Sequence, residues 1–112
     1  MAAGSFEVFV HSIVATAALV NARAVSAVGA LPAAAARCLG FAKFDAPIGA
    51  RVAVAVTGST LAEAGAAIAI GALLEVDALG RVITRAAGVP VGSALQAAAA
   101  AGDRIEIVLI VN

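Results

Sequence analysis

Apolar residues alternate with polar or small residues, with a period of two, along the clearly patterned stretches of this chain. The alternation runs through Arg51–Val56 and begins again at Arg104, after which residues 107–111 are continuously apolar. Alternation of this kind predicts β-strands, and the apolar run predicts a strand that enters a covered core. Phe6–His11 also alternates, and it predicts either the first strand of the domain or an extended N-terminal arm.

Turns that contain glycine separate these stretches. Residues 57–59, with Gly58 at their centre, are predicted to end the strand 51–56 as a turn. Asp77–Gly80 is predicted to join two short strands, because Gly80 tolerates the positive φ that a tight turn needs. Short strands separated by glycine turns at roughly 8–12 residues indicate a mostly β protein, built as a small β-barrel or β-sandwich.

Three segments carry weak helical signals. Thr60–Glu63 has the spacing of a capping box, but Gly65 interrupts the pattern that follows it. Gln96–Ala101 is rich in alanine and ends at Gly102. Leu31–Arg37 either begins a helical turn at its proline or is a loop. We therefore expect at most one or two short helical turns.

Several of these segments occur twice along the chain, at offsets of 51, 52 and 53 residues: Val25–Gly29 and Val76–Gly80, Leu39–Ala42 and Val91–Ala94, Gly49–Val54 and Gly102–Ile107. A repeat at this period predicts one supersecondary unit that is used twice and packed on itself. The repeated residues are glycines and aliphatic residues, so the repeat predicts a shared scaffold. The structural turns of this scaffold are expected at Gly29, Gly40, Gly49, Gly80, Gly92 and Gly102. Any specific contact surface is then expected in the parts that are not repeated, namely the N-terminal segment and residues 58–71.

The length of 112 residues predicts one β domain over residues 12–112, preceded by residues 1–11 as an arm or first strand. Seven basic residues balance seven acidic ones, so no electrostatic signature of a nucleic-acid or membrane partner is visible. The charged fraction of 12% is about half the usual share, which indicates either compositional bias or a surface covered by other protein. Neither a signal peptide nor a transmembrane segment is recognisable, so we expect synthesis in the cytoplasm.

Groups with chemical reactivity are few and isolated in the sequence. His11 is the only histidine and Cys38 the only cysteine, so neither has a partner of its own kind for a metal site or a disulfide. Cys38 lies beside Leu39 in an apolar stretch and is expected to be a small buried hydrophobe. Aspartates flank the predicted glycine turns, where carboxylates accept hydrogen bonds from backbone N–H groups: Asp45, Asp77 and Asp103.

The glycines match neither the phosphate-binding loop of nucleotide hydrolases nor the dinucleotide-binding fingerprint. Lys43 lies between Phe41 and Phe44, outside any lipoyl-type or biotinyl-type hairpin motif. We therefore expect that the protein is not an enzyme and has no catalytic, cofactor-binding or metal-binding residues.

Four segments in order resemble the capsid cement, or head decoration, proteins of tailed bacteriophages: Leu39–Val54, Gly71–Val82, Val91–Ala98 and Gly102–Leu109. Their order and spacing carry the resemblance, which covers roughly residues 12–111. The resemblance implies a β-barrel or β-sandwich of the β-tulip type that assembles as a homotrimer. It also implies a place on the outer capsid surface of the virion, bound to the major capsid protein. There the protein would stabilise the expanded head against the pressure of internal DNA.

The N-terminal segment is the candidate for capsid binding, because an extended arm can add a strand to an edge of a coat-protein sheet. Its candidate residues are Phe6, Val8, Phe9 and Val10. An alternative function is a surface binding module that contacts the host or a carbohydrate from the virion. An exposed aromatic cluster would favour that alternative, and the sequence has four phenylalanines but no tryptophan or tyrosine.

Overall fold

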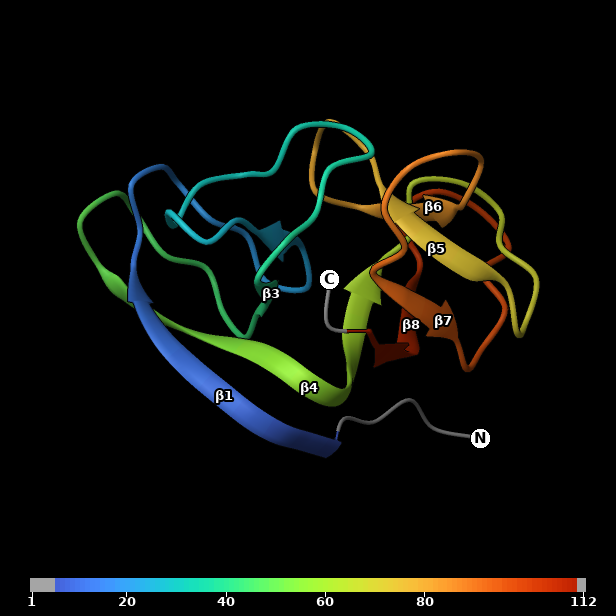
Figure 1. Cartoon of the computed structure of the whole chain (residues 1–112), viewed down its shortest axis with the longest axis horizontal. Coiled ribbons are helices and arrows are strands. Elements are labelled where there is room, and N and C mark those ends of the chain that lie inside the picture. The colour runs from blue at the N-terminus through green and yellow to red at the C-terminus, as the bar shows by residue number, and fades with distance from the viewer. Residues whose placement is uncertain (1–5, 111–112) are drawn as a thin grey trace.

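The computed structural model describes the backbone of residues 6–110 and the side chains of residues 10–110. Regular structure in this part of the chain is entirely β and forms one sheet of eight strands, which curls into a nearly closed barrel (Figure 1). The strands are β1 (Phe6–Val14), β2 (Ala24–Val25), β3 (Gly40–Ala42), β4 (Arg51–Glu63), β5 (Leu73–Val76), β6 (Val82–Thr84), β7 (Gly92–Ala94) and β8 (Arg104–Leu109). The prediction of a small, mostly β barrel is confirmed. No helix long and apolar enough to cross a membrane occurs between residues 6 and 110.

The strands follow the order β2-β3-β4-β8-β7-β5-β6, and β1 pairs with β4 outside this path. The 13-residue strand β4 links the two halves of the sheet. Its first part pairs with β1 and β3, and its last part pairs with β8. A bridge between Ala64 and Val82 then brings the end of β4 back to β6, which nearly closes the second half into a barrel.

The turn predicted at residues 57–59 is a bend inside β4, and the strand does not end there. Gly58 has a φ of 93°, and pairing passes from β1 to β8 at Ser59. Thr60–Glu63, the segment with capping-box spacing, is therefore strand. Thr60 is 3% and Ala62 0% exposed, so alternate residues face a core, and burial with a period of two decides in favour of β structure.

The internal repeat is present in the hydrogen bonds and is longer than the sequence predicts. Leu19 and Ala46 exchange backbone hydrogen bonds, and Ile68 and Ala98 exchange the same pair of bonds. The Gly29 N–H donates to the carbonyl of Ser26 and closes one turn. The Gly80 N–H donates to the carbonyl of Asp77 and closes the equivalent turn. Residues 10–56 therefore correspond to residues 59–109, with an offset that begins at 49 residues and grows through 51 and 52 to 53. The sequence alone aligns Val25 with Val76, but Val25 pairs with Gly40 as Leu74 pairs with Gly92, so its counterpart is Leu74.

This correspondence corrects one expectation, because the N-terminal segment and residues 58–71, which the sequence leaves without a repeat, are counterparts of each other. His11 of β1 pairs with Val54, and Thr60 of β4 pairs with Ile107 in the same way. The last segment of β4 is thus the second-half equivalent of β1. A functional difference between these two strand segments must therefore come from different side chains at equivalent positions.

Each half has its own hydrophobic core. The first core is formed by Ala15, Leu19, Val25, Ala42, Ala46, Val52 and Val54. Their counterparts all lie in the second core: Ala64, Ile68, Leu74, Ala94, Ala98, Ile105 and Ile107. The second core is larger because Cys38 and Phe41 of the first half pack into it and β6 adds Val82. Cys38 is 8% exposed, as expected of a small buried hydrophobe.

Gly40 and Gly92 are equivalent corners where two strands approach closely. A Cβ atom on Gly92 would lie 2.6 Å from the carbonyl oxygen of Val108, and one on Gly40 would collide with the carbonyl oxygen of Ala55. Val108 and Ala55 are themselves counterparts, so the repeat preserves the reason for glycine. The other four predicted turn glycines have positive φ values between 78° and 93°: Gly29, Gly49, Gly80 and Gly102.

Candidate functional site

The N-terminal candidate residues lie in β1, an edge strand whose pairing partner is β4. Phe6 lies opposite Ser59, and the register shifts on both sides of Phe9 before Val10 pairs with Ala55. The side chains of Phe6, Val8 and Phe9 lie outside the described ones. Val10 is therefore the one candidate of the four whose side chain is placed, and it is 45% exposed.

The two faces of β1 are distinguished by the residues of β4 that lie opposite. Ile13 lies opposite Val52 and packs against the first core. Because neighbours alternate between faces, Val10, Ser12 and Val14 share the other face. We call these three residues the β1 outer face. Val14 is 42% exposed, so two valines of this face are open to solvent.

At its two ends, the equivalent face in the second half carries polar side chains that are bonded within the subunit. Val10 corresponds to Ser59, whose hydroxyl donates a hydrogen bond to the carboxylate of Glu106 at 2.9 Å. Val14 corresponds to Glu63, which forms an ion pair with Arg23 at 3.0 Å. The end positions of this face are therefore exposed valines in the first half and bonded polar residues in the second. The middle position is reversed, with Ser12 in the first half and Leu61 in the second.

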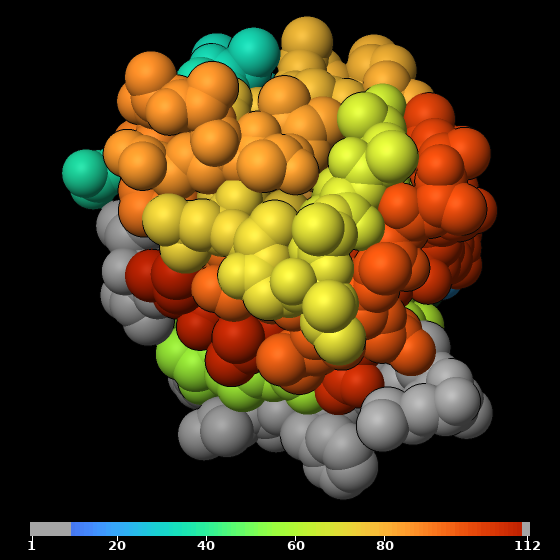
Figure 2. Space-filling view, turned by 90° about the vertical axis from the view of Figure 1, so that its right-hand side faces the viewer, coloured from blue at the N-terminus to red at the C-terminus, as the bar shows by residue number. Residues whose placement is uncertain are grey.

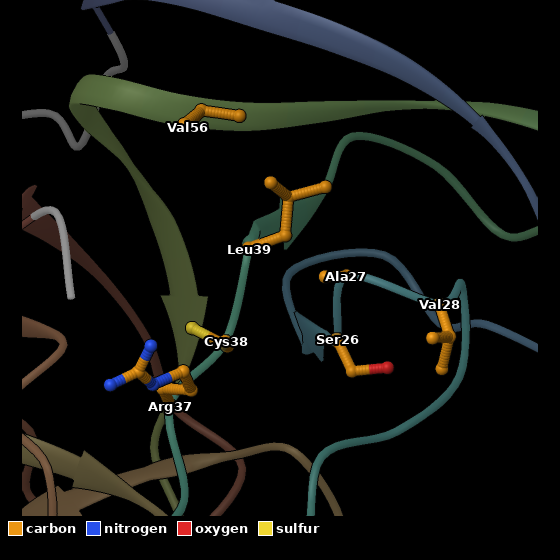
Figure 3. A pocket seen from close by; sticks show the side chains of 7 residues that line it. All are labelled: Ser26, Ala27, Val28, Arg37, Cys38, Leu39 and Val56. Atoms are coloured by element: carbon orange, nitrogen blue, oxygen red, sulfur yellow. The ribbon is translucent and has the colours of Figure 1, made fainter.

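A hollow of about 440 Å³ opens in the first half between β2, β3 and β4 (Figure 3). It is lined by Ser26, Ala27, Val28, Arg37, Cys38, Leu39 and Val56, and we call it the first-half hollow. The guanidinium of Arg37 extends away from the turn that carries Ser26 and Val28, so the lining toward that turn is mainly apolar. These residues include no carboxylate or imidazole, so their chemistry suits an apolar contact.

The aspartates that the sequence places at turns bind backbone N–H groups, as their positions predict. The pairs are Asp45 with the N–H of Asn21, Asp77 with that of Leu79 and Asp103 with that of Ala99, at 2.8–2.9 Å. His11 lies on β1 and is exposed. Among the described residues, no group of three or more histidine, cysteine or acidic side chains is placed to hold a metal ion.

Sequence reasoning missed Glu75, the buried acid of β5. Glu75 is 7% exposed. Its carboxylate accepts hydrogen bonds from the N–H of Ala86 at 2.7 Å and from the N–H of Gly88 at 3.0 Å. These two bonds hold the pKa of Glu75 below its ordinary value of 4.5, and the bond from Ala86 has the larger effect. The single available signal was an acidic residue in an otherwise apolar strand. Glu75 fixes the shape of residues 85–88, which we call the 85–88 loop.

Comparison with known proteins identifies a family. The family model described as phage cement protein matches residues 7–109 of this chain. The structure is similar to the crystal structure of the head fiber gp8.5 N base in bacteriophage phi29, with a TM-score of 0.76 over 91% of this chain and 93% of that one. The two sequences are 16% identical, so this likeness concerns the fold. No curated protein matches the chain.

Proposed function

The chain belongs to the phage cement protein family, and from this premise we propose that it binds the outside of the capsid through the β1 outer face. It does so as a homotrimer in contact with the major capsid protein. After synthesis in the host cytoplasm it joins the virion, where it stabilises the expanded head against the pressure of packaged DNA. Its role is structural, without catalysis or a cofactor.

The observation that carries the proposal is the contrast between the two ladders. Val10 and Val14 are exposed, whereas their counterparts Ser59 and Glu63 are bonded to Glu106 and Arg23, respectively. Two exposed aliphatic side chains on one face of an edge strand favour a surface that another protein covers. Within residues 6–110, β1 pairs with β4 along one edge, so its other edge also offers main-chain groups to a strand of the coat protein.

Stabilisation of the head follows from binding alone. A protein that binds the expanded lattice and not its precursor favours the expanded state by about 2.7 kcal/mol per site at a concentration of 100 times Kd. A homotrimer presents three copies of the β1 outer face at once. Simultaneous contacts then raise the effective affinity well above that of one subunit.

A pair of matched substitutions tests the proposal. Val10→Glu places a charge on the β1 outer face, and Val108→Glu places one at the equivalent ladder of the second half, where Val108 is 39% exposed. Both variants are expected to fold, because both side chains already reach solvent. Co-sedimentation with expanded heads is expected to show at least about ten-fold weaker binding for Val10→Glu and unchanged binding for Val108→Glu, equivalent to about 1.4 kcal/mol. Equal binding by the two variants would contradict the choice of surface.

Deletion of residues 1–10 tests the N-terminal segment as a whole. We expect the truncated protein to bind expanded heads more weakly and to remain a folded trimer, because residues 11–14 keep their pairing with β4. Circular dichroism and light scattering measure the fold and the oligomeric state. An unfolded truncated protein would show that the segment is an integral strand of the domain and not an arm.

A further inference from the structure

One half of the molecule docks a loop into the other, and the contact is made once although the scaffold is present twice. Ala35, which belongs to the first half, lies between the end of β5 and the connection from β6 to β7 in the second half. Its N–H donates to the carbonyl of Val76, and its carbonyl accepts from the N–H of Val89, both at 2.9 Å. Gly88 packs directly on it, because a Cβ there would lie 2.6 Å from the Cβ of Ala35.

The first-half hollow corresponds to the site in the second half that Ala35 fills. In the repeat, Arg37 corresponds to Val89 and Leu39 corresponds to Val91. Val91 is 1% exposed, whereas Leu39 is only partly buried. The Arg37 N–H has no hydrogen-bond partner among the described residues, whereas the N–H of Val89 is bonded to Ala35. The first half thus has an apolar hollow with an open donor where the second half holds a docked loop.

The segment that corresponds to the docked loop lies in the second half. Its Gly88 packs on Ala35, but its middle residues are not docked. By the offsets of the repeat, residues 33–36 correspond to the 85–88 loop. Ala86 and Ala87 of this loop are exposed, and this orange part of the chain lies at the surface of the second half (Figure 2). The carboxylate of Glu75 holds the loop from below, so the loop is already ordered before any partner arrives.

We infer that the first-half hollow receives the 85–88 loop of a second copy of this chain. The small side chains of Ala86 and Ala87 suit the site, because Ala35 fills the equivalent site within the subunit. A carbonyl of the incoming loop would accept from the N–H of Arg37, as the carbonyl of Ala35 accepts from Val89. The guanidinium of Arg85 is bonded to the carbonyl of Gly88 at 2.7 Å, so its charge is turned back onto its own loop.

The contact joins different surfaces of the two copies. Each subunit offers one hollow, in its first half, and one loop, in its second half. Contacts of this head-to-tail kind form a ring when the rotation between copies closes. The inference rests on the proposed homotrimer and names the surfaces that would close it.

Engineered disulfides test the contact directly. Val28 lines the hollow and is 70% exposed, so Val28→Cys is expected to fold. With Cys38→Ser to remove the native thiol, the variant with both Val28→Cys and Ala87→Cys is expected to give a covalent ring of three subunits under mild oxidation. Each single-cysteine variant is expected to stay uncrosslinked, and a mixture of the two is expected to give covalent dimers. Covalent dimers from either single variant would overturn the inference, because they would indicate a contact between identical surfaces.

Light scattering separates failure of the inference from failure of the homotrimer. Ala87→Arg is expected to weaken self-association at least about ten-fold, which is about 1.4 kcal/mol, whereas Ala101→Arg at an exposed turn is expected to leave it unchanged. A wild-type trimer that tolerates Ala87→Arg and gives no disulfide ring would refute this contact while the homotrimer stands. A wild-type protein that stays monomeric at all concentrations would refute both.

Discussion

Ala22 and Gly71 occupy equivalent positions in the two halves, and both have a positive φ, 66° and 83°. Their N–H groups donate to equivalent carbonyls, those of Ala42 at 2.9 Å and Ala94 at 2.7 Å. The left-handed conformation is therefore a property of the repeated scaffold. In the second half a glycine adopts this conformation, whereas in the first half an alanine with a buried methyl group adopts it.

Exchanging these two residue types is expected to have unequal effects. Gly71→Ala is expected to cost about 1 kcal/mol, because alanine is strained at positive φ although the space for its methyl group is open. Ala22→Gly is expected to change stability by less than about 0.5 kcal/mol. Relief of the strain there offsets the lost burial of a methyl group and the greater freedom of the unfolded chain. Denaturant titration followed by far-ultraviolet circular dichroism measures both, and a larger cost for Ala22→Gly would contradict this account.

The two corner glycines are expected to be the least tolerant of substitution. Gly92→Ala is expected to cost about 2 kcal/mol and Gly40→Ala more, because the new methyl group meets a backbone carbonyl that cannot move alone. Gly102→Ala is the matched control, with a positive φ but nothing within 4 Å of its Cβ position, and about 1 kcal/mol is expected. The same denaturant titration ranks the three variants. Equal costs at Gly92 and Gly102 would remove close strand approach as the reason.

Phe41 is expected to couple the unfolding of the two halves. It belongs to a strand of the first half but is fully buried in the second core, so Phe41→Ala is expected to cost about 3–5 kcal/mol. Its counterpart is Ser93, and Ser93→Ala is expected to cost less than about 1 kcal/mol. Hydrogen exchange in Phe41→Ala is expected to be faster at Ile107, in the second core, as well as near residue 41. Unchanged exchange at Ile107 would show that the halves unfold separately.

Glu75 is expected to make stability depend on pH. Since its pKa in the folded protein lies below the ordinary 4.5, the stabilisation is fully present above pH 4.5 and is lost as the pH falls through the lowered value. Glu75→Gln is therefore expected to be less stable than the wild type at neutral pH, and the two proteins are expected to converge in acid. Denaturant titrations at several pH values measure the difference. A difference that does not change with pH would exclude the carboxylate charge as its source.

The 85–88 loop gives a second readout for the same variant. Glu75 accepts the N–H groups of Ala86 and Gly88, so Glu75→Gln is expected to speed amide exchange at these two residues by at least about ten-fold. Exchange at Leu19, in the first core, is the internal control and is expected to stay slow. Equal acceleration at all three residues would point to global destabilisation instead of a local effect on the loop.

Local patterns in the sequence were enough for the β class, the Asp77–Gly80 turn and most of the repeat. Each of these depends on neighbouring residues, through alternation with a period of two or through the φ that a turn requires. The sequence predicts an end to the strand β4 at residues 57–59, because a glycine between polar residues normally marks a turn. Pairing with β1 on one side of that bend and β8 on the other keeps the chain extended there, and such pairing is invisible to a local pattern.

The amino-acid sequence by itself therefore determined the kind of unit, its duplication and the residues at its corners, since these follow from short-range sterics and the burial of alternate side chains. Tertiary structure alone decided that β1 and the last part of β4 are equivalent, because their side chains differ while their hydrogen-bonding partners match. Tertiary structure also decided which of two equivalent surfaces is covered. Val10 is exposed, whereas its counterpart Ser59 is bonded. The first-half hollow is open, whereas Ala35 fills its counterpart in the second half. Coverage depends on contacts between residues far apart along the chain, so it is a property of the folded molecule.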